Sequence, residues 1–235
     1  LITRRSEVQI LPPLLSRSQS KDWLRFFFAQ SRSCPNDARM SRILGVDPGT
    51  LRCGYAVVET NPGRATQPRY IECGVIELPA KAPIAERLRL LASDLREVIV
   101  ELQPSELALE SAFAGINVRS ALLLGQARGA IMLVGAEAGL CIYEYPPATI
   151  KKTVCGNGRA QKSEVQRIVS WLCKLSSPPP TDAADAVAIA LCHAFHAPQR
   201  ALTAQAMKQQ PRATAPQHPR VSAVRTPSVP ARSGR

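Results

Sequence analysis

The chain has 235 residues, of which 45% are hydrophobic and 20% charged, a composition typical of a globular protein with its own core. We find no apolar run near the ~20 residues of a membrane helix, so the composition excludes a membrane protein, a disulfide scaffold and a fully disordered chain. The net charge of +12 is concentrated at the ends: residues 1–40 carry +4, residues 41–195 carry +1 and residues 196–235 carry +7. A polyanionic partner is compatible with this charge but is not required by it.

The two ends differ in composition from the middle of the chain. Residues 1–39 are rich in Arg and Ser, and Met40 stands directly before Ser41-Arg42-Ile43-Leu44-Gly45-Val46-Asp47. We expect this extension to be disordered, and to be either a misassigned start upstream of Met40 or a basic presequence. Residues 197–235 are basic, rich in Pro, Ala and Arg, and contain no acidic residue. We expect a disordered tail, either a solubilising appendage or an electrostatic tether to nucleic acid.

Residues 40–196 are predicted to form one compact domain. Period-two apolar runs and turn residues predict strands at 43–47, 54–58, 70–78, 105–110 and 140–145. Apolar residues at steps of three and four predict helices at 88–102, 117–138, 165–172 and 183–195. Strands first, then strands alternating with helices, predict an α/β fold with a mixed five-stranded sheet flanked by helices.

Two further features of this domain carry expectations. The helix at 117–138 is apolar nearly all round, which predicts burial on two sides, by its own sheet and by another body such as a second subunit. The seven cysteines are odd in number and include no CxxC pair, so we expect reduced, buried thiols rather than disulfides or a zinc site.

Four carboxylates stand where apolar elements begin or end. Asp47 closes the first strand, Glu110 closes the fourth, and Asp182 and Asp185 open the last helix three residues apart. A carboxylate at the end of an apolar strand is costly to bury unless it is paired or binds a cation. Converging carboxylates suit Mg²⁺ or Mn²⁺, and two such ions form an apparatus for phosphodiester hydrolysis.

Three of these carboxylates also have a local structural interpretation. Asp182 suits a helix N-cap, and Asp185 is favourable in a first helical turn. Asp47 precedes Pro48-Gly49 and suits a turn. Glu110 has no comparable local role, because it ends an apolar strand. Taken singly, these residues therefore leave the structural and the metal-binding interpretations open.

Several motifs in order along the domain carry a resemblance. They are Asp47-Pro48-Gly49-Thr50 with Gly54-Tyr55, Leu109-Glu110-Ser111-Ala112-Phe113, Gly125-Gln126-Ala127-Arg128-Gly129, Lys151-Lys152-Thr153-Val154, and Asp182-Ala183-Ala184-Asp185-Ala186. Over about residues 41–195 the chain resembles the RuvC family of Holliday junction resolvases, the crossover junction endodeoxyribonucleases. The resemblance implies a ribonuclease H-like fold, a homodimer, a bacterial cytoplasmic location and a RuvA-RuvB branch-migration partner. It also implies Mg²⁺-dependent cutting of two symmetric strands at a four-way DNA junction, in recombination and repair.

The resemblance also assigns residue roles. The four carboxylates would be catalytic and would bind two Mg²⁺ ions, for which Mn²⁺ would substitute: Asp47, Glu110, Asp182 and Asp185. Phe113 matches an aromatic residue that stacks at the junction, although it also suits an ordinary core position. Lys151 and Lys162 match lysines near the scissile phosphate, and otherwise would be solvated surface charges. Ser163 is expected to cap the helix that follows Lys162, so that backbone amides and ammonium meet one phosphate.

Two positions depart from the family pattern. Ile116 and Leu123 stand where relatives often carry Lys, which removes positive charge near the expected groove. We hypothesise that Arg119, Arg128 or the basic tail compensates. Two other functional classes remain as alternatives: an actin-like ATPase, for which 235 residues are too few, and a junction-binding module that does not cut.

Overall fold

The computed structural model describes residues 40–61, 67–111 and 118–208. The strands are β1 (Ser41–Asp47), β2 (Arg52–Thr60), β3 (Arg69–Glu77), β4 (Glu106–Glu110) and β5 (Cys141–Tyr145). The helices are α2 (Ile84–Leu102), α3 (Val118–Glu137), α4 (Pro147–Cys155), α5 (Lys162–Leu172) and α6 (Thr181–Lys208). The expectations for residues 1–39, for Phe113 and for the tail beyond 208 lie outside the described residues.

The five strands form one mixed sheet in the order β3-β2-β1-β4-β5, which confirms the predicted α/β sheet. β1, β2 and β3 are antiparallel neighbours, whereas β4 is parallel to β1 and β5 is parallel to β4. Val46 of β1 pairs with Leu109 of β4. Because these two strands are parallel, the residues that follow the pair, Asp47 and Glu110, lie at the same edge of the sheet.

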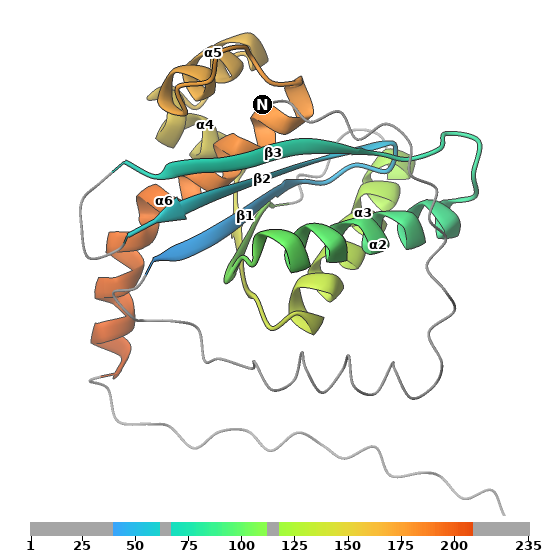
Figure 1. The fold of residues 1–235 in the computed structure, drawn as a ribbon, viewed down its shortest axis with the longest axis horizontal. Coiled ribbons are helices and arrows are strands. Elements are labelled where there is room, and N and C mark those ends of the chain that lie inside the picture. The colour runs from blue at the N-terminus through green and yellow to red at the C-terminus, as the bar shows by residue number, and fades with distance from the viewer. Residues whose placement is uncertain (1–39, 62–66, 112–117, 209–235) are drawn as a thin grey trace, which may run out of the picture.

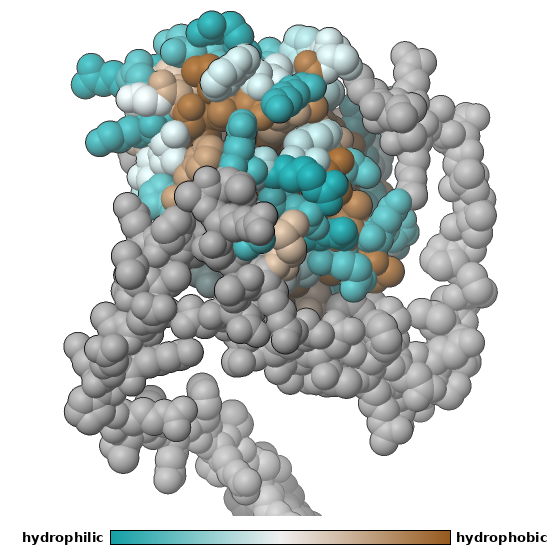
Figure 2. Space-filling view, turned by 60° about the vertical axis from the view of Figure 1, so that its left-hand side comes forward, coloured by the Kyte–Doolittle hydropathy of each residue, from teal (hydrophilic) through white to brown (hydrophobic). Residues whose placement is uncertain are grey.

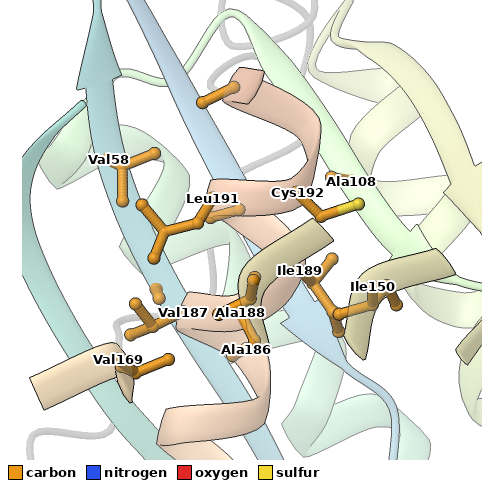
Figure 3. Packing of buried hydrophobic residues seen from close by; sticks show 14 of the residues in the cluster. Val58, Ala108, Ile150, Val169, Ala186, Val187, Ala188, Ile189, Leu191 and Cys192 are labelled. Atoms are coloured by element: carbon orange, nitrogen blue, oxygen red, sulfur yellow. The ribbon is translucent and has the colours of Figure 1, made fainter. Parts of the chain in front are cut away.

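Helices cover both faces of the sheet, and strand residues alternate between the two cores (Figure 1). Leu44 and Val46 of β1 belong to the core that includes residues of α2 and α3. Ile43 belongs to the opposite core, which contains residues of α4, α5 and α6. Figure 3 shows this second core, where Ile189 and Leu191 of α6 lie among side chains from the sheet and the neighbouring helices.

The outer surface of the second core is only partly covered. In the space-filling view, hydrophobic residues reach the surface near the top, where Figure 1 places α4 and α5, and hydrophilic residues surround them (Figure 2). Partly buried residues of α5, including Ile168 and Leu172, pack against this core. None of the described helices is long and apolar enough to cross a lipid bilayer.

The helix α3 buries one face and exposes the other. Ile131 and Val134 are buried in the core beneath it. Val118, Leu122 and Leu133 are 72%, 65% and 58% exposed. The predicted burial of α3 against the sheet is therefore confirmed. The apolar face on the other side of the helix is exposed in the single chain.

Three helices differ from the sequence expectations. α2 begins at Ile84, one turn before the predicted start at 88. α4 was not predicted, although Pro147 at its first turn is a recognised helix-start signal. α6 continues to Lys208, so the domain boundary predicted at 196/197 falls inside this helix. Residues 199–208 are rich in Ala, Gln, Leu, Met and Lys, which favour helix over the disorder expected from their polarity.

The cysteines of the described residues follow the expectation of reduced, buried thiols only in part. Cys53, Cys73, Cys155, Cys173 and Cys192 are free thiols, but only Cys53 and Cys192 are buried. Cys141, at the start of β5, is disulfide-bonded, so the expectation of reduced thiols is wrong for this residue. Spacing along the chain does not reveal such a pairing, because a disulfide depends on proximity in three dimensions.

Two glycines let α6 lie directly against the β1–β2 hairpin. A Cβ at Gly45 would collide with the carbonyl oxygen of Ala186 and lie 2.7 Å from the backbone nitrogen of Ala190. A Cβ at Gly54 would collide with the carbonyl oxygen of Asp182. Because these are backbone atoms of α6, any side chain at either position would push the helix away from the sheet.

Substitution of Gly45 by alanine tests this contact. We expect Gly45→Ala to lower the free energy of unfolding by about 1–3 kcal/mol, since the added methyl group overpacks a backbone contact. Urea denaturation measures the change. Gly129→Ala is the matched control, because a Cβ there meets nothing within 4 Å and α3 should be unchanged or up to about 1 kcal/mol more stable. Equal effects of the two substitutions would contradict the proposed role of the glycine.

Candidate active site

The strand carboxylates face α6 because of the sheet's period of two. Asp47 shares its side of β1 with Ile43 and Gly45, both of which meet the α6 side. Glu110 shares its side of β4 with Ala108, which belongs to the same core. Both carboxylates therefore point toward the layer of α6, at the edge where β1 and β4 end.

The helix carboxylates come to this edge at the start of α6. Asp182 and Asp185 lie in the first turns of the helix, and the Gly54 contact places the backbone of Asp182 directly on β2. The helix begins at Thr181, so Asp182 lies inside its first turn and is not the capping residue. The structure thus brings all four predicted carboxylates to one end of the α6 face of the sheet.

A buried network holds the middle of α6 against the sheet. His193 is fully buried, and its Nε2 lies 2.5 Å from Oε2 of Glu106, the first residue of β4. The hydroxyl of Tyr145 lies 2.8 Å from Nδ1 of His193, and Ser41 donates to Oε1 of Glu106 at 2.7 Å. These bonds join β1, β4, β5 and α6, so they limit sliding of the helix along the sheet. Sequence patterns did not single out this network, because its members are far apart in the chain.

The carboxylates raise one another's proton affinity. Burial raises the pKa of Asp47 from 3.8 to about 7, and the charges of Asp185, Glu110 and Asp182 add to this effect, while Lys162 opposes it. Burial also raises the pKa of Glu110, with Asp185 adding to the shift. Negative charge is therefore concentrated at this edge beyond what the neighbouring cations neutralise.

Two cations pair with the helix carboxylates. Arg52 Nε lies 2.7 Å from Oδ2 of Asp182, and Lys162 Nζ lies 3.2 Å from Oδ2 of Asp185. The carboxylate of Asp185 is the main cause of a raised pKa at Lys162. The predicted lysine thus lies in the carboxylate cluster, whereas Arg52 was missed, because nothing in the sequence places residue 52 beside residue 182.

The donor chemistry of the cluster fits a hard divalent cation, but its present arrangement is not that of a closed metal cage. Across residues 40–61, 67–111 and 118–208, no group of three or more His, Cys, Asp or Glu side chains is arranged to hold a metal ion. Asp182 and Asp185 instead face Arg52 and Lys162. The four carboxylates would supply the oxygen ligands that Mg²⁺ and Mn²⁺ prefer if Asp182 and Asp185 exchanged their present cation partners for a metal ion.

The basic residues near the site differ partly from expectation. Lys151 lies in α4, and its charge lowers the pKa of Glu110, as expected of a neighbour of the cluster. The helix α5 begins at Lys162 with Gln161 in the capping position, so Ser163 lies in the first turn and the prediction that it caps the helix is wrong.

Arg128 does not fit the hypothesis that it compensates for missing DNA contacts. Arg128 as a whole residue is 7% exposed to solvent, and its guanidinium donates a hydrogen bond to the carbonyl oxygen of Glu110. A second nitrogen, Nη2, lies 3.0 Å from Oε1 of Glu144 on β5. The hypothesis is wrong for this residue, because a buried guanidinium with two internal partners is not presented to a ligand.

Comparison with known proteins agrees with this geometry. Residues 43–193 match the family described as crossover junction endodeoxyribonuclease RuvC. The RuvC protein of Azorhizobium caulinodans is 45% identical over 168 residues, covering 72% of this chain and 98% of that protein. That of Halorhodospira halophila is 46% identical over 171 residues, covering 72% of this chain and 100% of that protein.

The solved structures that resemble this chain include RuvC structures. Thermus thermophilus RuvC is 32% identical with a TM-score of 0.61, covering 68% of this chain and 97% of that one. Its complex with a Holliday junction substrate has a TM-score of 0.63, with the same identity and coverage. The yeast mitochondrial Holliday junction resolvase Ydc2, at 13% identity and a TM-score of 0.52, covering 80% of this chain and 89% of that one, shares the fold.

The mixed sheet with carboxylates at the ends of β1 and β4 is thus a ribonuclease H-like nuclease fold. Within that class, the chain belongs to the RuvC family of crossover junction endodeoxyribonucleases.

The raised pKa of Asp47 predicts a pH-dependent cost to stability. The folded state holds the Asp47 proton more tightly than the unfolded state. The contribution of Asp47 to the free energy of unfolding therefore falls as pH rises from about 4 through about 7. At pH 8 without divalent metal, we expect Asp47→Asn to be more stable than the wild type by about 1–3 kcal/mol. At pH 4 the difference should shrink. Urea unfolding at the two pH values measures it.

Glu97→Gln, an exposed carboxylate on α2, is the control and should change stability by less than about 0.5 kcal/mol. If Asp47→Asn is no more stable than the wild type at pH 8, the concentration of negative charge inferred for this edge is contradicted.

Proposed function

We propose that this chain resolves Holliday junctions by paired, symmetric cuts through metal-assisted phosphodiester hydrolysis, as an enzyme of recombination and repair. The observation that carries the proposal is the convergence of Asp47 and Glu110 with Asp182 and Asp185 on one edge of the sheet, in a chain of the RuvC family. A Thermus relative has been solved with such a junction bound.

In this proposal the four carboxylates hold two Mg²⁺ ions, with Mn²⁺ able to substitute. The ions, when bound, would supply a water of lowered pKa and would stabilise the charge that develops on the leaving oxygen. The chain's own residues set the conditions for this chemistry. Asp47 contributes a largely buried carboxylate at the end of β1, and the burial and like-charge repulsion that raise its pKa would be offset when a cation is taken up.

The DNA phosphate would be held by cations beside the carboxylates. Lys162 pairs with Asp185, and if that carboxylate held a metal, the ammonium of Lys162 would be available to the scissile phosphate. Lys151 lies close enough to Glu110 to influence its pKa, and it would contact the DNA strand that carries the scissile phosphate. Phe113, which lies outside the described residues, would stack on an unpaired base of the junction.

Symmetric cutting of two strands calls for two copies of the site related by a two-fold axis, so we propose a homodimer. The exposed apolar residues of α3, Val118, Leu122 and Leu133, support a second body at this helix. The RuvA-RuvB branch-migration complex is the proposed partner. The named relatives with high identity are bacterial proteins, and we place the activity in a bacterial cytoplasm.

A cleavage assay tests the function. Protein beginning at Met40 should nick a synthetic four-way junction at paired, symmetric positions with Mg²⁺, and should leave a linear duplex of the same sequence intact. Asp47→Asn and Glu110→Gln should lower the single-turnover rate by about 10³-fold or more, because a mispositioned ion forfeits several kcal/mol of transition-state stabilisation. Asp94→Asn, on α2 across the sheet, should cut normally. Tight binding to the junction without nicks would instead indicate a binding module.

A binding assay tests the role of Lys151. We expect Lys151→Ala to bind the junction more weakly and to reduce the slope of log Kd against log salt concentration by about 1, since one phosphate contact is lost. Lys81→Ala, an exposed lysine just before α2, should leave the slope unchanged. If both variants behave like the wild type, Lys151 does not contact the DNA backbone.

A further inference from the structure

Arg128 is a buried charge in the middle of α3, on the side of the helix that faces the sheet. The side chain is 9% exposed, in a helix whose opposite face exposes several apolar residues. Taking a guanidinium out of water is costly unless its donors are satisfied inside the protein. The groups that satisfy the guanidinium of Arg128 therefore indicate its structural role.

The two printed partners of Arg128 lie on neighbouring strands. Nη1 donates to the carbonyl oxygen of Glu110, the last residue of β4. Nη2 lies 3.0 Å from Oε1 of Glu144, on β5. Glu110 and Tyr145 are paired across these two strands, so the guanidinium contacts the sheet at the edge where the carboxylates converge.

Arg128 adds a side-chain contact to the backbone at the end of β4. β4 ends at Glu110, and one hydrogen bond beyond the pair, from Ser111 N to the carbonyl oxygen of Tyr145, continues the ladder. A planar guanidinium can hold a carbonyl and a carboxylate at once with fixed geometry, whereas an ammonium acts as a point charge on a flexible stem.

We propose that Arg128 is a positioning residue for Glu110: by binding the Glu110 carbonyl and Glu144 together, it fixes the strand end from which the Glu110 carboxylate reaches the metal site. This inference rests on the proposed function of the carboxylates. It requires that substitution of Arg128 weaken metal binding through Glu110, although Arg128 itself never touches the metal or the DNA.

The experiment compares Arg128→Lys with the wild type, Glu110→Gln and a matched control. The control is Arg96→Lys, because Arg96 also forms an ion pair with a glutamate, Glu137, at 2.9 Å, but on the outer surface between α2 and α3. Each protein is first tested for folding by circular dichroism and thermal unfolding. Mn²⁺ affinity is then measured by electron paramagnetic resonance without DNA, and the rate of junction cutting is measured as a function of Mg²⁺ concentration.

We expect Arg128→Lys to weaken Mn²⁺ binding by about 10-fold or more, the usual cost of losing a residue that orients a metal ligand. Cutting should be slow at low Mg²⁺ and recover toward the wild-type rate at high Mg²⁺. Arg96→Lys should leave both quantities unchanged. Glu144→Gln, which keeps the bond to the Glu110 carbonyl, should have a smaller effect than Arg128→Lys.

The outcomes separate this inference from the proposed function. A folded Arg128→Lys protein with wild-type Mn²⁺ affinity and Mg²⁺ dependence would overturn the positioning role, even if the wild type cuts junctions as expected. Lower thermal stability with unchanged metal affinity would likewise overturn it, since that is the result of a purely structural role. A wild type that binds Mn²⁺ in an Arg128-dependent way but does not cut would refute the proposed function alone. A wild type with no Mn²⁺ affinity would refute both.

Discussion

The direct contact between α6 and the β1–β2 hairpin is the interaction on which the candidate site depends. Glycines at positions 45 and 54 allow backbone to meet backbone, so that the first turns of α6 come down beside the ends of β1 and β4. The His193–Glu106 network limits movement near the middle of the helix. Asp182 and Asp185 are therefore placed by packing of α6 between Asp182 and His193, and not by a local turn.

This contact gathers negative charge that the protein must balance. Arg52 and Lys162 pair with the helix carboxylates, while the pKa of Asp47 is raised to about 7 because it is buried among like charges. Uptake of a divalent cation would relieve the repulsion and release Lys162 toward the substrate. The repulsion among the carboxylates that lowers the stability of the protein would thus favour metal binding. Functional sites commonly show such a compromise between stability and activity.

The site is also held from the side of α3. Arg128 connects this helix to the ends of β4 and β5, and the opposite face of the helix is the exposed apolar surface on which a second subunit is proposed. One helix therefore contributes both to the position of Glu110 and to the surface available for assembly.

Sequence patterns were sufficient to predict the sheet, most of the helices and the four carboxylates, because alternation, helical spacing and strand-end acids are local patterns. The family motifs then indicated their chemistry. Local patterns could not reveal Arg52 beside Asp182, the burial of Arg128 or the His193–Glu106 pair, since each joins residues far apart in the chain. They also misjudged the end of α6, where helix-forming residues sit in a polar, basic composition. Which charges face one another became evident only in the folded chain, because burial and pairing depend on how the elements pack.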